Sequence, residues 1–219
     1  MTTAVLKKYK LVIFDWDGTV MDSISKIVNC IRHSALALNI EPPSDTAIKN
    51  IIGMSLELAI EVLFPEDVAH HPALINGYKQ QYRVDTTATP VFDNVENVLS
   101  ALKAQGVILA IATGKGRDGL MRLLEQTQLG HYFSATRTSD EARSKPSPDM
   151  LEQLLAELAI NADEALMIGD TKIDMAMAQA ANIDRIGVTM GVHSAAQLSE
   201  FSPVATVDNY QQLQRILLG

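Results

Sequence analysis

Two aspartates one residue apart follow an apolar segment near the start of the chain. Asp15 and Asp17 come directly after Leu-Val-Ile-Phe at 11–14, and Gly18 follows them. Gly18 favours a turn here, so the strand predicted over 10–16 ends and both carboxylates can converge beyond its carboxyl end. Open α/β sheets bind their ligands at that end of the strands. A turn followed by a helix cap is the alternative that involves no chemistry.

Two later strands are also predicted to end in polar residues. The apolar segment 107–112 runs into Thr113, and the segment 165–168 leads to Asp170. Asp174 is four residues further on, one helical turn along the same face. Taken singly, Thr113 and Asp170 are equally well explained as helix caps. Together they place hydroxyl and carboxylate groups around one edge of a sheet.

Lys145 adds a positive charge in a proline-rich loop, where a solvated lysine is the plain alternative. Two carboxylates about 4 Å apart repel by about 4 kcal/mol at an effective dielectric of 20. A cluster of Asp15, Asp17 and Asp170 therefore needs a hard divalent cation, and Mg²⁺ suits a few carboxylates plus a substrate phosphate. The five histidines have no partners at metal-ligand spacing and are interpreted as structural or surface residues.

The segments between these motifs predict the elements that position them. Residues 20–87 show helical spacing with no strand signal, with helices expected at 22–39, 44–51, 55–63 and 67–83. Strands and helices then alternate, which is typical of a parallel sheet covered on both faces. We expect a core of residues 1–19 and 88–219 and an inserted helical cap of residues 20–87. Asp93 with Glu96, and Ser147 with Pro148, are read as helix starts.

The composition limits the class of protein. The chain has 219 residues and is 47% hydrophobic, enough for a substantial core, and its net charge of −8 offers no face for nucleic acid. One cysteine excludes an internal disulfide and fits a reducing compartment. No segment resembles a signal peptide or approaches the roughly 20 apolar residues of a membrane span. A cytoplasmic protein is predicted.

The ordered motifs resemble those of the haloacid dehalogenase-like (HAD) hydrolase superfamily. The matching residues are Asp15-x-Asp17-Gly18-Thr19, Thr113, Lys145 and Gly169-Asp170-x-x-x-Asp174. The resemblance covers essentially the whole chain and implies an α/β fold, a Rossmann-like parallel sheet with a small α-helical cap. The Asp22-Ser23 pair resembles the Asp-Ser pair into which the first motif continues in the phosphoglycolate phosphatase-like subgroup.

The resemblance also implies roles for these residues. Asp15 would be the nucleophile that forms an aspartyl-phosphate, and Asp17 would be the general acid and then the base. The Asp15 side chain, Asp170 and the main-chain carbonyl of Asp17 would bind Mg²⁺, and Asp174 would orient the water bound to it. Residues expected to hold phosphoryl oxygens and neutralise their charge are Thr113, Gly114 and Lys145.

Several residues near the motifs are candidates for selecting the substrate. Trp16 stands where the subgroup usually has a smaller aliphatic residue, and Gly114 stands where asparagine is common. Trp16 either packs in the core, which we favour, or narrows the pocket. The other candidates for selecting a substrate are Asp22, Ser23, Gly53, Met54 and Ser55, although 53–55 could equally be a plain turn between helices.

We therefore expect a Mg²⁺-dependent phosphatase of a small phosphorylated metabolite, with phosphoglycolate as one candidate. A sugar-phosphate mutase or a pyrophosphatase on the same scaffold is the alternative among enzymes. A receiver-like module with a phosphorylatable aspartate is the alternative from another class, and a catalytically silent interaction protein is a third. No nucleic-acid or membrane partner is expected, and the sequence does not distinguish a monomer from a homodimer.

Overall fold

A computed structural model describes residues 8–219. Its centre is a six-stranded, all-parallel sheet with the strand order β3-β2-β1-β4-β5-β6. The parallel pairing confirms the prediction from alternating strands and helices. The strands are β1 (Leu11–Phe14), β2 (Ile108–Ala112), β3 (Ala135–Arg137), β4 (Ala165–Gly169), β5 (Asp184–Val188) and β6 (Ala205–Val207).

The central position of β1 brings three of the predicted motifs together. Phe14 is in register with Ile111 of β2 on one side and Ile168 of β4 on the other. All four residues of β1 are buried, which explains why the strand reads as a continuous apolar run. The residues that follow β1, β2 and β4 therefore emerge side by side at one edge of the sheet.

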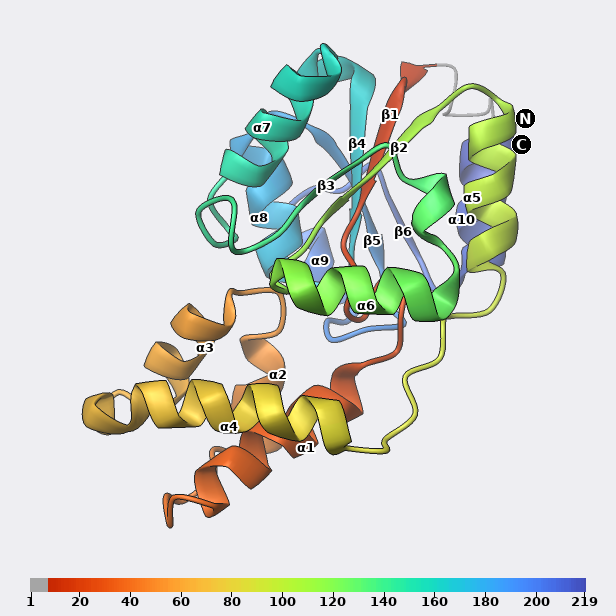
Figure 1. Cartoon of the computed structure of the whole chain (residues 1–219). Helices are drawn as coiled ribbons and strands as arrows, with labels where there is room; N and C mark the ends of the chain where they lie inside the picture. The colour runs from red at the N-terminus through yellow and green to blue at the C-terminus, as the bar shows by residue number, and fades with distance from the viewer. Residues whose placement is uncertain (1–7) are drawn as a thin grey trace.

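Helices cover both faces of the sheet (Figure 1). One apolar cluster joins the sheet to α5 (Val95–Ala104), α6 (Arg117–Thr127) and α10 (Tyr210–Leu218). The cluster on the opposite face includes α7 (Asp149–Leu158) and α8 (Lys172–Ala180). This confirms the predicted α/β architecture. The short helix α9 (Ala195–Ser199) was not predicted.

The insertion after β1 consists of helices that lie beyond the carboxyl ends of the strands (Figure 1). They are α1 (Ile24–Leu36), α2 (Asp45–Asn50), α3 (Leu56–Leu63) and α4 (His71–Val84), with a 3-10 turn at Val68–His70. They pack around two apolar clusters of their own. We call these helices and their connections the cap. The exact domain boundaries stay a prediction, since Val20 and Met21 already pack into the core cluster.

Two predicted helix starts are wrong in detail. Asn94, in a left-handed conformation, caps α5 without a side-chain hydrogen bond, so Asp93 does not form the predicted capping box. Pro148 occupies the N-cap position of α7, one residue later than predicted from Ser147. Among residues 8–219, no helix combines the length and apolar character needed to cross a membrane.

Candidate active site

Three buried carboxylates meet beyond the ends of β1 and β4. Asp15 follows β1, Asp170 follows β4, and Asp174 lies in the first turn of α8. One oxygen from each lies within 4.8 Å of the others. The approach is close enough to require Gly18, which has φ +82°, because a Cβ at that position would lie 2.4 Å from Asp170 Oδ2. The structure thus brings Asp15 and Asp170 together as predicted.

Burial makes this cluster electrostatically costly. It raises the pKa of Asp15 to about 7 against the lowering effect of Lys145, and the charge of Asp174 adds to the rise. Burial likewise raises the pKa of Asp170 above its usual range, with Asp174 and Asp15 contributing. Asp15 Oδ2 is buried and has no hydrogen-bond partner among residues 8–219. An all-oxygen, negatively charged donor set with such a free atom fits a hard divalent cation.

Lys145 is the ammonium group that contacts two of the three carboxylates. Its Nζ lies 2.7 Å from Asp15 Oδ1 and 2.7 Å from Asp174 Oδ1, and its side chain is fully buried. Burial alone would lower the pKa of Lys145, but Asp15 and Asp174 raise it above its usual range, so the group stays charged. Asp174 Oδ2 accepts the hydroxyl and backbone N–H of Thr171, which cap α8. Asp174 is thus committed to Lys145 and Thr171.

The carboxylate of Asp17 lies apart from this trio. Its Oδ1 accepts a 2.6 Å hydrogen bond from the Ser23 hydroxyl, and its Oδ2 lies 3.2 Å from Lys115 Nζ. Asp17 is not among the three carboxylates that lie within 4.8 Å of one another. The predicted convergence of Asp15 and Asp17 on one point stays a prediction. The turn at Gly18 brings Ser23 back against Asp17. Asp17 still lines the same cavity as Asp15, so a molecule bound there can contact both.

Thr113 and Gly114 form the wall of the cavity next to the carboxylates. Thr113 is buried, and its hydroxyl oxygen accepts the N–H of Lys115 at 3.2 Å, which leaves the hydroxyl proton free to donate. A Cβ on Gly114 would lie 2.3 Å from the carbonyl oxygen of Met54 and 2.4 Å from that of Gly53. The cap loop 53–54 therefore packs directly on the Gly114 peptide, and no other residue fits this arrangement.

Comparison with known proteins gives the family of the chain. Residues 12–188 match the haloacid dehalogenase-like hydrolase family, well over half of the sequence. The chain belongs to this family. Its fold and the order of its site residues agree with that assignment, which confirms the resemblance seen in the sequence.

Individual relatives of this haloacid dehalogenase-like hydrolase span nearly its whole length. A Dickeya dadantii protein named "Probable phosphatase IndB" is 34% identical over 209 residues, 93% of this chain and 91% of the relative. A Vibrio cholerae phosphoglycolate phosphatase is 26% identical over 97% of this chain and 99% of its own. The solved structure of a hydrolase from Pseudomonas syringae is 25% identical, with a TM-score of 0.85 over 94% of this chain and 99% of that one.

The residues considered for substrate selection lie in different environments in the structure. Trp16 is fully buried in the core, edge-on to Phe133, and does not line the cavity, because its strand position directs it into the cluster under α6. Asp22 is exposed, and Ser23 holds Asp17. Gly53 and Met54 do line the cavity. The backbone N–H of Ser55 donates to the Ser144 hydroxyl at 2.8 Å, which ties the cap loop to the loop of Lys145.

Two further residues of this site had no assigned role in the sequence analysis. Lys115 is almost buried, contacts Asp17, and lies 4.7 Å from the ring centroid of Tyr82, which belongs to cap helix α4. Burial alone would lower the pKa of Lys115, but Asp17 and the tyrosines raise it above its usual range. Lys115 directly follows Thr113-Gly114, a position that could have drawn attention to it, whereas nothing in the sequence indicated Tyr82.

Proposed function

We propose that this hydrolase is a Mg²⁺-dependent phosphatase that cleaves the phosphate monoester of a small metabolite through a phosphorylated Asp15. The observation that carries the proposal is the environment of Asp15. One oxygen is held by Lys145 while the other has no partner among the described residues, and a second carboxylate, Asp170, lies alongside. Relatives named as phosphatases support the same activity.

Mg²⁺ would be held by the side chains of Asp15 and Asp170 and the main-chain carbonyl of Asp17. When bound, it supplies positive charge against the phosphoryl oxygens and the carboxylates. Asp170 is prepared for this role, since Thr19 donates to its Oδ1 at 2.9 Å and the N–H of Val192 donates to its Oδ2 at 2.8 Å. Both oxygens are thereby fixed in orientation and keep lone pairs for a cation.

Catalysis would proceed in two balanced steps. In the first, a carboxylate oxygen of Asp15 forms a bond to phosphorus, the ester P–O bond breaks, and protonated Asp17 gives its proton to the leaving alcohol. In the second, a water oxygen bonds to phosphorus while Asp17 takes a proton from the water. The acyl-phosphate bond then breaks, which releases phosphate and restores the Asp15 carboxylate.

The other site residues would hold the transferred group. The Thr113 hydroxyl and the Gly114 N–H would donate to phosphoryl oxygens, and the Lys145 ammonium would offset the negative charge shared by phosphate and Asp15. Phosphoryl transfer depends mostly on such positioning and charge stabilisation, so these residues would supply the kinds of interaction that the reaction needs.

Relatives named phosphoglycolate phosphatase make phosphoglycolate one candidate substrate.

The location of the protein is a separate part of the proposal. A single buried cysteine, Cys30, fits a location in the reducing cytoplasm.

Replacement of the nucleophile tests the proposed function. Asp15→Asn keeps the shape of the side chain but is not expected to release measurable phosphate from p-nitrophenyl phosphate. The unfolding midpoint should be no lower than that of the wild type, because a buried carboxylate has been removed. Asp93→Asn, on the exposed surface before α5, serves as the matched control and should keep full activity. Wild-type turnover by Asp15→Asn would exclude Asp15 as nucleophile.

Removal of the metal tests the proposed cofactor. Treatment with EDTA should abolish phosphate release, and an excess of Mg²⁺ should restore it, because the carboxylate excess around Asp15 otherwise repels an anionic ester. Undiminished turnover in EDTA would reject the metal assignment while leaving the role of Asp15 open to the substitution above.

A further inference from the structure

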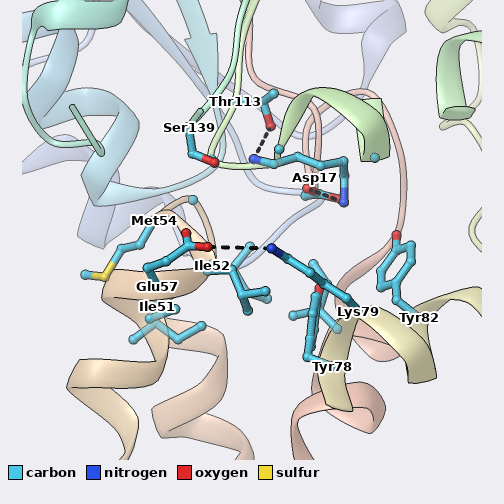
Figure 2. Close-up of a pocket in the computed structure, with 18 of the residues that line it drawn as sticks. Asp17, Ile51, Ile52, Met54, Glu57, Tyr78, Lys79, Tyr82, Thr113 and Ser139 are labelled. Carbon is cyan, nitrogen blue, oxygen red and sulfur yellow. Dashed lines mark hydrogen bonds and ion pairs between the residues drawn. The ribbon is translucent and has the colours of Figure 1, made fainter. Parts of the chain in front are cut away.

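The cavity between the sheet edge and the cap has an apolar side provided by the cap. It has a volume of about 220 Å³, and the cap contributes Ile27, Ile51, Ile52, Tyr78 and Tyr82 to its lining. Figure 2 shows Asp17 and Thr113 at one side of this space and Ile52 and Tyr78 across from them. The leaving group of a phosphate held at Asp15 therefore faces hydrocarbon and aromatic surface.

Among the described residues, the cations that line this cavity are paired or exposed. Lys115 contacts Asp17, and Lys79 lies 3.7 Å from Glu57, whose own charge would repel a carboxylate. Arg83 and Arg122 are exposed. Among the described lining residues, none offers an unpaired, buried positive charge to a short carboxylate such as that of phosphoglycolate. Burying such a charge without a partner is strongly unfavourable.

Besides Asp15 Oδ2, the lining holds a neutral polar group without a hydrogen-bond partner among the described residues. The hydroxyl of Tyr82 is buried and has no hydrogen-bond partner within residues 8–219. Two ammonium groups lie near its ring, Lys26 at 4.8 Å and Lys115 at 4.7 Å from the centroid. A buried hydroxyl inside an apolar wall suits an uncharged ligand that can offer it a hydrogen bond.

We propose that this site selects phosphate monoesters whose leaving alcohol is uncharged and carries an apolar group of about the size of a ring. A dry apolar cavity of about 150 Å³ accommodates benzene. The cavity here has about 220 Å³, a volume that also includes the phosphate side at Asp15 and Thr113. The inference rests on the proposed phosphatase activity and adds the class of ester. It disfavours phosphoglycolate for this chain, although several relatives carry that name.

Competition between two primary phosphate esters tests this inference. Benzyl phosphate and 2-phosphoglycolate both lose a primary alcohol, so their comparison reports on the pocket rather than on a stabilised aryl leaving group. The wild-type kcat/KM should be at least about tenfold higher for benzyl phosphate. Ile52→Lys places an ammonium group in the apolar wall and should shift the ratio toward phosphoglycolate by about tenfold or more. Val62→Lys, on the exposed face of α3, is the control and should leave the ratio unchanged.

The results that would contradict this inference differ from the result that would contradict the proposed function. Equal or higher kcat/KM for phosphoglycolate would overturn the inference and leave the phosphatase intact. No turnover of benzyl phosphate by an enzyme that hydrolyses p-nitrophenyl phosphate would also overturn it. A protein that releases phosphate from no ester, p-nitrophenyl phosphate included, would instead contradict the proposed function itself.

Discussion

At the scale of single residues, the site depends on how few positive charges face its carboxylates. Among residues 8–219, Lys145 is the cation paired with Asp15 and Asp174, and Lys115 is the cation paired with Asp17. The placement of Asp15 and Asp170 at one edge of the sheet could be predicted from the sequence, because each follows an apolar strand. The direction of the Asp17 side chain could not, since it depends on the backbone turn at Gly18 and on a hydrogen bond from Ser23.

Lys115 is expected to act as a positioning residue for Asp17. Lys115→Met removes the ammonium group 3.2 Å from Asp17 Oδ2 and leaves that carboxylate held by Ser23 alone. General acid–base catalysis contributes about 100- to 10,000-fold, so a misplaced Asp17 should lower kcat by about tenfold or more. Steady-state kinetics should show a larger effect on kcat than on KM.

A conservative variant separates positioning from folding. Lys115→Arg retains the charge and should recover part of the lost kcat, while Lys103→Met, on an exposed helix face of α5, should behave as the wild type. A Lys115→Met enzyme with unchanged kcat would show that Ser23 is sufficient to hold Asp17.

At the scale of elements, hydrophobic periodicity identified the strands and the long helices. A long helix buries one consistent face, and a strand of this sheet buries one or both of its faces. Their ends were less predictable. Asn94 begins α5 through a left-handed conformation, and α9 has only five residues, too few for a periodic signal. The contact between the cap loop 53–54 and Gly114 was also inaccessible to sequence reasoning, since it joins segments about sixty residues apart.

The loop contact predicts a specific effect of a methyl group. Gly114→Ala would place Cβ within 2.4 Å of the carbonyl oxygens of both Gly53 and Met54, so the cap loop must move away from the sheet. We expect KM to rise by about fivefold to thirtyfold, corresponding to about 1–2 kcal/mol, because the loop lines the substrate cavity. The melting temperature should change little, since the loop can shift without opening the core. Activity assays and thermal unfolding measure the two quantities.

Gly130→Ala provides the comparison for that substitution. A Cβ at Gly130 meets Leu124 at an ordinary distance of 3.6 Å and lies away from the cavity, so KM should not change. An unchanged KM in Gly114→Ala would show that the loop contact has no part in substrate binding.

At the scale of the whole molecule, hydrogen bonds join segments that lie far apart in the sequence. The residues just before β1 bond to the start of β5: Lys8 Nζ and the Tyr9 hydroxyl lie 2.8 and 2.7 Å from Asp184 Oδ2. At the other end, the Tyr210 hydroxyl of α10 donates to the carbonyl of Thr19, in the loop after Asp15. The parallel sheet could be inferred from the alternation of elements, but these tertiary contacts could not. Of them, the Tyr210 hydrogen bond to Thr19 holds the loop after Asp15.

The contact at Asp184 predicts a pH-dependent contribution to stability. Although partial burial opposes it, hydrogen bonds from Lys8 and Tyr9 lower the pKa of Asp184 below its usual 3.8. A lowered pKa in the folded state stabilises the protein above the unfolded value, and this stabilisation is lost as the pH falls through the folded value. Asp184→Asn should therefore cost about 1 kcal/mol at pH 7, a modest value because the pair is partly exposed.

Denaturant unfolding at several pH values checks this prediction. The difference between Asp184→Asn and the wild type should shrink as the pH is lowered below 4, while Asp163→Asn, an exposed carboxylate nearby in the fold, should show little difference at any pH. A constant difference down to the lowest pH would mean that the ionised form of Asp184 contributes nothing.

The most direct test of the proposed mechanism is a search for phosphate on Asp15. The Asp17→Asn protein is mixed with p-nitrophenyl phosphate, whose leaving group needs no protonation, and is quenched within the first turnover. Borohydride then reduces an aspartyl-phosphate to homoserine, and mass spectrometry of the peptide containing residues 11–19 locates it. We predict one equivalent of released nitrophenol and homoserine at position 15. Steady turnover with an unmodified Asp15, or reduction at another residue, would contradict the mechanism.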